Sequence, residues 1–292
     1  MKHFDLTSDL HIDFWLDYRN PPKKQERLLG EFVAKMLPEE PSNVLVIAGD
    51  LGHFNQQNKM MLEAFRKHYS AIVVVFGNHD LYLVSKSQVK KYETSFNRLN
   101  EMIDIANSIP NVHFLTGTSV TLDDITFGGS GGWYDNTYAK TFYSMNDRQI
   151  DEMWLNFMND GRLIKDFNRY DLALSEYGNL KSVADSVDVM VSHIAPTYDF
   201  IPLKYNNATS TFYQFDGSDL LNRMGSGKVW CYGHTHDKIM SVRRSDTQLC
   251  CNPLGYPFGR DYDFSEISDK RKNCRINIEN VPTYEAIFEN LS

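Results

Sequence analysis

The sequence predicts an α/β fold with parallel strands at its centre, and two observations support this prediction. Two short β-branched runs, NVLVIAGD at 43–50 and AIVVVFGNHD at 71–80, each resemble a buried strand that ends in a polar loop. Between them, QQNKMMLEAFRKHY at 56–69 has the apolar spacing of a helix. A helix between two buried strands indicates a βαβ unit, in which the strands are parallel.

The remaining elements follow the same alternation. An apolar stripe from Leu28 to Leu37 predicts a helix that stops at Pro38. Apolar residues from Val89 to Ala106 recur at helical intervals, strand-like runs follow at 112–129, and a further helix is expected at 170–184. The last part is rich in strands, with the runs SVDVMVSHIAP, GKVWCYGHTHD, IMSVRR and TQLCCNP.

Length and composition indicate one elaborated globular domain over 1–292. The chain has 292 residues, 42% of them hydrophobic, and shows no internal repeat and no obvious linker. A helical cap or insertion is expected around 83–185, because the stretch between the third and fourth polar loops exceeds what a minimal crossover needs. Insertions of this kind often determine substrate choice.

Charge and apolar patterning exclude several classes of function. The net charge of −8 argues against non-specific nucleic-acid binding, because the protein as a whole repels polyanions. No run approaches the roughly 18 apolar residues of a membrane span, and the first residues lack the pattern of a signal peptide. The four cysteines show no CxxC spacing, which favours reduced thiols and a cytoplasmic location.

Polar residues that bind metals cluster directly after the apolar runs. The segments are Ser8-Asp9-Leu10-His11, Gly49-Asp50, Gly77-Asn78-His79-Asp80, His193 and Gly233-His234-Thr235-His236. Because the carboxyl ends of strands meet at one crevice in an α/β sheet, these segments are expected to converge. Oxygen and imidazole donors without thiolate suit divalent Mn, Fe, Ni or Zn. Each of the three glycines precedes a predicted ligand, where a missing Cβ permits a close backbone approach.

The ordered set DxH, GD, GNHD, H and GHxH resembles the calcineurin-like metallophosphoesterase superfamily. The segments TFGGSGGWYD, YSMNDR and LCCNPLGYP resemble a branch of it found in bacteria and phages. The resemblance implies a two-layer β-sandwich flanked by α-helices and a site for two divalent metal ions, with Mn²⁺ expected and Fe, Ni or Zn as alternatives. Two predicted ligand sets follow from it, of which the first comprises Asp9, His11, Asp50 and His236, and the second Asp50, Asn78, His193 and His234. Asp50 would bridge the two ions.

The resemblance also implies roles in catalysis. It implies hydrolysis of phosphate esters by in-line attack of a hydroxide that bridges the metals, with His79 assisting the leaving group. Asp80 would orient the ring of His79, although the start of a helix offers it an equally good structural role. Asn78, His79 and Arg148 are the candidate substrate-binding residues, and Trp133, Tyr134, Asn146 and Asp147 are weighed as a pocket rim against aromatic packing and loop capping.

Departures from the family pattern bear on the substrate. Many relatives continue the second motif to GDxxD, whereas this chain has His53 in place of the last carboxylate, either supporting the site, leaning over the substrate or simply exposed, with exposure slightly favoured. Relatives often have CNPRG where this chain has Leu254 in place of arginine. Phe76 and Asn55 occupy positions that belong to phosphate-gripping motifs in the protein phosphatases.

A small phosphodiester of the nucleotide type is therefore the expected substrate, because a diester carries one negative charge and needs a guanidinium clamp less than a monoester does. The alternatives are a phosphomonoesterase or a nucleotide pyrophosphohydrolase using the same site. A binding protein without catalysis is the remaining class, although every expected ligand is present in the sequence.

Overall fold

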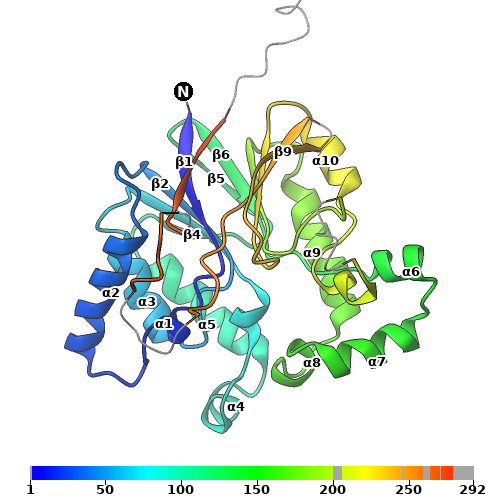
Figure 1. The fold of residues 1–292 in the computed structure, drawn as a ribbon, viewed down its shortest axis with the longest axis horizontal. Coiled ribbons are helices and arrows are strands. Elements are labelled where there is room, and N and C mark those ends of the chain that lie inside the picture. The colour runs from blue at the N-terminus through cyan, green and yellow to red at the C-terminus, as the bar shows by residue number, and fades with distance from the viewer. Residues whose placement is uncertain (1, 200–205, 245, 259–263, 270, 279–292) are drawn as a thin grey trace, which may run out of the picture.

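The computed structural model describes residues 2–199, 206–244, 246–258, 264–269 and 271–278. Within these ranges the strands form two sheets that face each other, with helices on their outer sides (Figure 1). The predicted α/β class and the two-layer sandwich flanked by helices are confirmed. None of the helices in the described ranges is both long and apolar enough to span a membrane.

The first sheet has the strand order β11-β1-β2-β3-β4. Its strands are β1 (His3–Thr7), β2 (Val44–Ala48), β3 (Ala71–Val75), β4 (Val112–Phe114) and β11 (Cys274–Asn277). β1 to β4 run parallel, whereas β11 pairs antiparallel with β1. Parallel pairing brings the carboxyl ends of β1, β2 and β3 to the same edge, as the βαβ pattern predicts.

The second sheet has the order β5-β6-β7-β8-β10-β9. Its strands are β5 (Thr118–Leu122), β6 (Ile125–Gly129), β7 (Val189–Val191), β8 (Val229–Tyr232), β9 (Ile239–Arg244) and β10 (Thr247–Cys251). β6, β7, β8 and β10 are parallel, and β5 and β9 lie antiparallel at the two edges. The loops after β7 and β8 therefore also lie at one edge.

Alternating side chains of the central strands build two cores. Every residue of β2 is buried; Val44, Val46 and Ala48 face the core between the sheets, while Leu45 and Ile47 face the outer helices. This alternation is what a strand covered on both sides requires. Phe4 and Phe127, one from each sheet, meet edge to face with ring centroids 5.3 Å apart and join the layers.

The helices largely follow the apolar stripes of the sequence. They are α1 (Ile12–Trp15), α2 (Pro22–Met36), α3 (Asn55–Phe65), α4 (Lys86–Tyr92), α5 (Ser95–Ser108), α6 (Thr137–Tyr143), α7 (Asp147–Phe157), α8 (Asp160–Leu163), α9 (Arg169–Val183) and α10 (Ser218–Met224). Two 3₁₀ turns, η1 (Asn78–Leu81) and η3 (Ala208–Phe212), lie in loops.

The predicted stripe from Val89 to Ala106 is interrupted between α4 and α5. Glu93 adopts φ 64°, outside the helical region, and the hydroxyl of Thr94 accepts the N–H of Asn97 to start the next helix. The segment 83–185, predicted as a helical insertion, also contains β4, β5 and β6 of the two sheets. Its helices α6, α7 and α8 extend to one side of the sandwich (Figure 1).

Candidate metal centre

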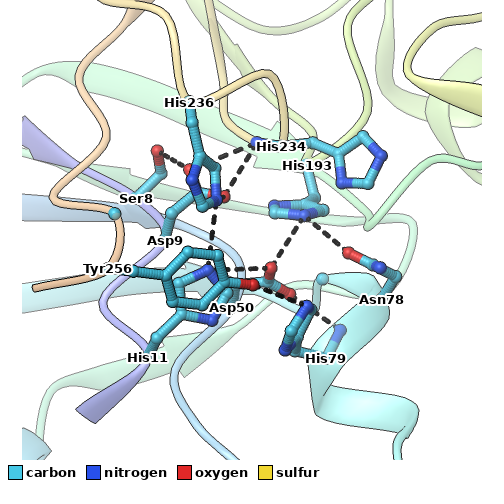
Figure 2. Close-up of polar contacts among 12 residues, drawn as sticks. Ser8, Asp9, His11, Asp50, Asn78, His79, His193, His234, His236 and Tyr256 are labelled. Atoms are coloured by element: carbon cyan, nitrogen blue, oxygen red, sulfur yellow. Dashed lines mark hydrogen bonds and ion pairs between the residues drawn. The ribbon is translucent and has the colours of Figure 1, made fainter. Parts of the chain in front are cut away.

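The predicted ligands converge at the edge where the parallel strands end. Figure 2 shows the side chains of Asp9, His11, Asp50, His193 and His236 gathered around one centre. Among the described residues, three trios place ligand atoms within 4.8 Å of one another: Asp9–His11–His236, Asp9–Asp50–His193 and His11–Asp50–His79. Residues more than 220 positions apart in the chain thus meet at a single site.

The first predicted set presents its donor atoms to one another. Nε2 of His11 lies 3.2 Å from Nε2 of His236, which itself lies 3.2 Å from Oδ1 of Asp9. Ligand atoms bound tetrahedrally at about 2.0–2.2 Å from a metal lie about 3.3 Å apart, so these spacings fit a shared cation. Nδ1 of His11 is buried and has no hydrogen-bond partner among the described residues.

Asp50 lies between the two sets. Its Oδ2 is 3.6 Å from Nε2 of His11 and 3.4 Å from Nε2 of His193. Its Oδ1 accepts the backbone N–H of His79 at 2.9 Å, which fixes the carboxylate plane. One oxygen placed between histidines of both sets is the arrangement expected of a bridging ligand.

The histidines of the second predicted set are held in place by backbone carbonyls outside the site. Nδ1 of His193 contacts the carbonyl of Ala48 at 2.9 Å, and Nε2 of His234 contacts the carbonyl of Phe212 at 3.0 Å. In a neutral imidazole, the ring nitrogen that donates to a carbonyl carries the only hydrogen, and the other nitrogen is free to bind a metal. Oδ1 of Asn78 lies 3.2 Å from Nε2 of His193 and completes this set.

The backbone at the site is strained. Asp9, His11, Asp50, His234 and His236 all have positive φ, between 41° and 66°. Residues other than glycine rarely adopt this left-handed region, and such outliers cluster at functional sites, where the surrounding structure enforces them. Five of the seven predicted metal ligands thus hold an unfavourable conformation.

The glycines before the ligands are required by close packing. A Cβ on Gly77 would lie 2.1 Å from Oδ1 of Asp50, and one on Gly49, where φ is +87°, would lie 2.5 Å from Nδ1 of His193. A side chain at either position would displace a predicted ligand.

Burial and mutual contact divide the histidines into two protonation classes. Burial lowers the pKa of His11 to about 4, and burial with nearby His193 lowers the pKa of His234 to about 4. These two rings are neutral at pH 7, the form that binds metals.

The other two histidines each pair with a carboxylate. Burial by itself lowers the pKa of His193, but Asp50 outweighs burial and raises this pKa to about 9. Asp9 likewise outweighs burial and raises the pKa of His236. Burial favours a higher pKa for Asp9 and Asp50, yet their histidine neighbours hold both pKa values below the ordinary range. Each predicted set thus contains one histidine whose pKa is lowered and one whose pKa is raised.

Asp80 and Arg98 organise the loops that carry the ligands. The carboxylate of Asp80 accepts the N–H groups of Gly77, Asp50 and Leu51 at 2.8, 3.0 and 3.1 Å. Burial, together with nearby Asp50, raises the pKa of Asp80 to about 6. The fully buried guanidinium of Arg98 donates to the carbonyls of Gly52, His79 and Asp80, a role that no sequence pattern indicated.

The ring of His79 has partners other than the predicted Asp80. Its Nδ1 lies 3.0 Å from Nε2 of His53, and Nδ1 of His53 lies 2.7 Å from Oδ2 of Asp13. Its Nε2 lies 3.1 Å from the hydroxyl of Tyr256, whose ring stacks on His11 with centroids 4.5 Å apart. His53 is buried, so the favoured expectation of an exposed residue is wrong, and Asp80 takes the alternative structural role at the start of η1.

A cavity of about 400 Å³ opens beside these residues. Asp50, Asn78, His79, His234 and His236 form its metal side. Its other walls come from Phe157, Met158, Asn159, Ala195, Thr197, Asn207, Thr209, Ser210, Tyr213, Gln214, Asp237 and Tyr256, among others. Among its described lining residues there is no lysine or arginine.

Several residues weighed as a pocket rim lie elsewhere. The side chain of Arg148 is 88% exposed and pairs with Glu152 on the same face of α7, away from the cavity lining. Trp133 and Tyr134 are packed in the core, Asn146 caps α7, and Asp147 pairs with Lys140. Core packing, helix capping and an ion pair therefore account for these four residues, and none of them lines the cavity.

The chain is similar to known proteins in sequence and in fold. The chain is 24% identical over 277 residues to the uncharacterized protein L509 of Acanthamoeba polyphaga mimivirus, a match that covers 89% of this chain and 94% of that protein. The solved structure of phosphopantetheinyl hydrolase from Mycobacterium tuberculosis superposes with a TM-score of 0.65 at 15% identity, covering 97% of this chain and 96% of the other, and thus shares the fold.

The family model of the calcineurin-like phosphoesterases matches residues 2–238, which include every predicted metal ligand. The predicted resemblance is confirmed, and the chain belongs to the calcineurin-like phosphoesterases.

Proposed function

We propose that this phosphoesterase uses two metal ions to hydrolyse phosphodiesters. The position of Asp50 is the observation that carries the proposal. Because one carboxylate oxygen lies within 3.6 Å of a histidine in each ligand set, two cations would share it. Asp9, His11, Asp50 and His236 would hold one ion, and Asp50, Asn78, His193 and His234 the other.

The donor set also limits the choice of ion. Carboxylate, amide and imidazole donors suit Mn²⁺, with Fe, Ni or Zn as alternatives. When bound, the two ions neutralise negative charge on the phosphate and activate water for in-line attack. The remaining chemistry falls to side chains of this chain.

His79 is the group that we assign to the leaving oxygen. Its Nε2 faces the cavity, where the hydroxyl of Tyr256 accepts its N–H before substrate binds. Burial lowers the pKa of His79 well below its ordinary value, which makes the ring neutral. A neutral ring can still donate from Nε2 if its Nδ1 accepts a proton in exchange.

His53 supplies that exchange in this proposal. In the protonation state that we assign, His53 donates from Nδ1 to Asp13 and from Nε2 to Nδ1 of His79. As the leaving oxygen takes the Nε2 proton of His79, the proton of His53 moves to Nδ1 of His79. The two rings together thus give one proton, and with it one positive charge, to the leaving oxygen, and Asp13 fixes the orientation of His53.

The cavity supports a diester with an uncharged arm. Its described lining residues contain no lysine or arginine, and Asp237 adds a negative charge, so a further anionic group on a substrate would find no guanidinium or ammonium partner there. Neutral amides and hydroxyls of Asn207, Thr209 and Gln214, with the rings of Phe157 and Tyr213, suit a polar but uncharged arm or a base.

The name of the Mycobacterium tuberculosis protein agrees with this substrate class. A phosphopantetheinyl group joins its phosphate to a long chain of neutral amides. Since the two proteins share 15% identity, the cavity of this chain remains the basis of the proposal.

Competing substrates test the proposal directly. The experiment compares kcat/KM for a bis-aryl phosphate diester and the matching aryl monoester, at identical Mn²⁺ loading. A preference for the diester is expected, because no described guanidinium is placed to grip a dianion. A monoester preference of tenfold or more would instead indicate a phosphomonoesterase.

A further inference from the structure

Asn78 can serve a metal in only one of its two orientations. Its amide oxygen is a ligand atom, whereas its NH₂ group has no lone pair for a cation. A half-turn of the amide exchanges the two and would direct NH₂ toward His193, 3.2 Å from the present oxygen. The protein therefore needs a device that holds the oxygen inward.

The carboxylate of Asp160 provides this device. Its Oδ1 accepts from Nδ2 of Asn78 at 2.8 Å and from the hydroxyl of Tyr82 at 2.5 Å, and its Oδ2 accepts from the hydroxyl of Tyr134 at 2.8 Å. Nδ2 of Asn78 also lies 3.0 Å from the hydroxyl of Tyr82. Three donors thus converge on a fully buried carboxylate, and the NH₂ group of Asn78 faces Asp160 and Tyr82 while its oxygen faces His193.

The two tyrosines can act only as donors toward Asp160. The hydroxyls of Tyr82 and Tyr134 lie 2.5 and 2.8 Å from the carboxylate oxygens, and each donates its hydrogen to one of them. The oxygen that faces Asn78 already accepts the hydroxyl of Tyr82, so the NH₂ end of Asn78 is the end that pairs with it. A flipped amide would place two acceptors in contact without a proton between them.

Asp160 also comes from the part of the chain that shapes the cavity. It begins α8, directly after the cavity residues Phe157, Met158 and Asn159. Figure 1 shows α7 and α8 outside the two sheets. One short segment thus contacts both the substrate cavity and the side chain of Asn78.

We propose that Asp160 is a positioning residue, which orients Asn78 for metal binding and couples the α7–α8 segment to the metal centre. The inference rests on the proposed function, because it takes Asn78 to be a ligand of the second ion. Asp160 touches neither ion. Its effect is carried by the amide of Asn78 alone.

Metal titration of the full chain tests this role. Metal-free wild type, Asp160→Ala and Asp160→Asn are titrated with Mn²⁺, and the two binding steps are followed by calorimetry and by the electron paramagnetic resonance of coupled and isolated Mn²⁺. Asp160→Ala should weaken the second ion 10- to 100-fold, the usual effect of losing a partner that orients a ligand. Asp160→Asn should lose less, about threefold or more, because its amide oxygen still accepts a hydrogen bond but its NH₂ can also turn toward Asn78.

Two controls separate orientation from general damage. Asp147→Ala removes a carboxylate at the start of α7 that pairs with Lys140 and does not contact Asn78 or Asp160, and this variant should bind Mn²⁺ as the wild type does. In an Asn78→Ala background, either Asp160 variant should cause no further loss, because no amide is left to orient. If Asp160→Ala does not fold, Asp160→Asn is judged by the same two criteria.

The outcomes distinguish this inference from the function on which it rests. Wild-type affinity in an Asp160 variant that folds, or an equal loss in the Asn78→Ala background, overturns the positioning role and leaves the two-metal site intact. If the wild type binds fewer than two ions, or Asn78→Ala binds both at wild-type affinity, the proposed function fails and this inference fails with it.

Discussion

The two predicted ligand sets differ in how their side chains are oriented. In the second set, His193 and His234 each contact a backbone carbonyl and Asn78 contacts Asp160, so every ligand except the shared Asp50 has a partner outside the site. In the first set, Nδ1 of buried His11 has no partner among the described residues, and the side chain of His236 is 31% exposed. The second set is therefore preorganised, whereas the first depends more on the ion itself. We expect the two ions to bind with different affinity, the first set being the weaker.

Asp50→Asn should weaken metal binding in both sets at once, because both sets contain Asp50. We expect the variant to bind neither ion stably and to lose activity by on the order of 10³-fold or more. Elemental analysis of the remetallated proteins measures the effect, with Asp17→Asn, at a half-buried carboxylate that pairs with Arg19 outside the site, as the matched control. Wild type that is fully active with one ion or none would contradict the two-ion centre.

His79→Ala should leave both sets intact and stop the chemistry. Turnover should fall on the order of 10²-fold or more, in line with the loss of a general acid, while the metal content stays at the wild-type value. Diesters with poor leaving groups should show the largest loss, and exposed His68→Ala serves as the control. Unchanged hydrolysis of such a substrate would assign His79 a structural role only.

The pH dependence of metal binding to the second set should follow the proton on His193. His193 must lose a proton before it binds an ion, and its pKa is raised to about 9, so the proton competes with metal at every pH below 9. Affinity should therefore rise about tenfold for each pH unit from 7 to 9 and then level off.

The same shift predicts the stability of the metal-free protein. A folded pKa above the unfolded value stabilises the protein at low pH, and this contribution is lost as pH rises from about 6.5 through 9. Thermal unfolding of the metal-free protein between pH 6 and 9 measures this loss of stability.

The protons released from His193 on metal binding are measured by calorimetry in buffers of different ionisation enthalpy. Metal uptake at pH 7 without proton release would show that His193 is already neutral.

His53→Ala and Asp13→Asn should have the smallest effect, because both act on the chemistry through His79. We expect about a tenfold fall in kcat with little change in KM or in metal content. Neither change should lower the activity of His79→Ala further. An additional loss in that background would show that His53 acts on the substrate or on the fold instead.

Much of the site could be predicted from the chain alone, because its motifs follow strands directly. A β-branched run followed by Gly-Asp, or by Gly-Asn-His-Asp, identifies both the strand and the side chains at its end, and parallel strands bring those ends together. Asp9, Asp50 and His193 were predicted in this way, and the structure places them in one group of potential metal ligands. Local sequence therefore determined the fold class and which residues gather at the centre.

The partners of those residues were decided by the tertiary structure. Asp13, Arg98, Asp160 and Tyr256 belong to no recognisable spacing, and each reaches the site from a different element. His53 and Asp80 were predicted from neighbouring positions, yet their contacts depend on how the loops after β2 and β3 pack against each other. A hydrogen bond between two distant segments depends on how the two segments pack against each other. A pattern along one segment therefore determines which side chains are present at the site, but not which atoms form hydrogen bonds.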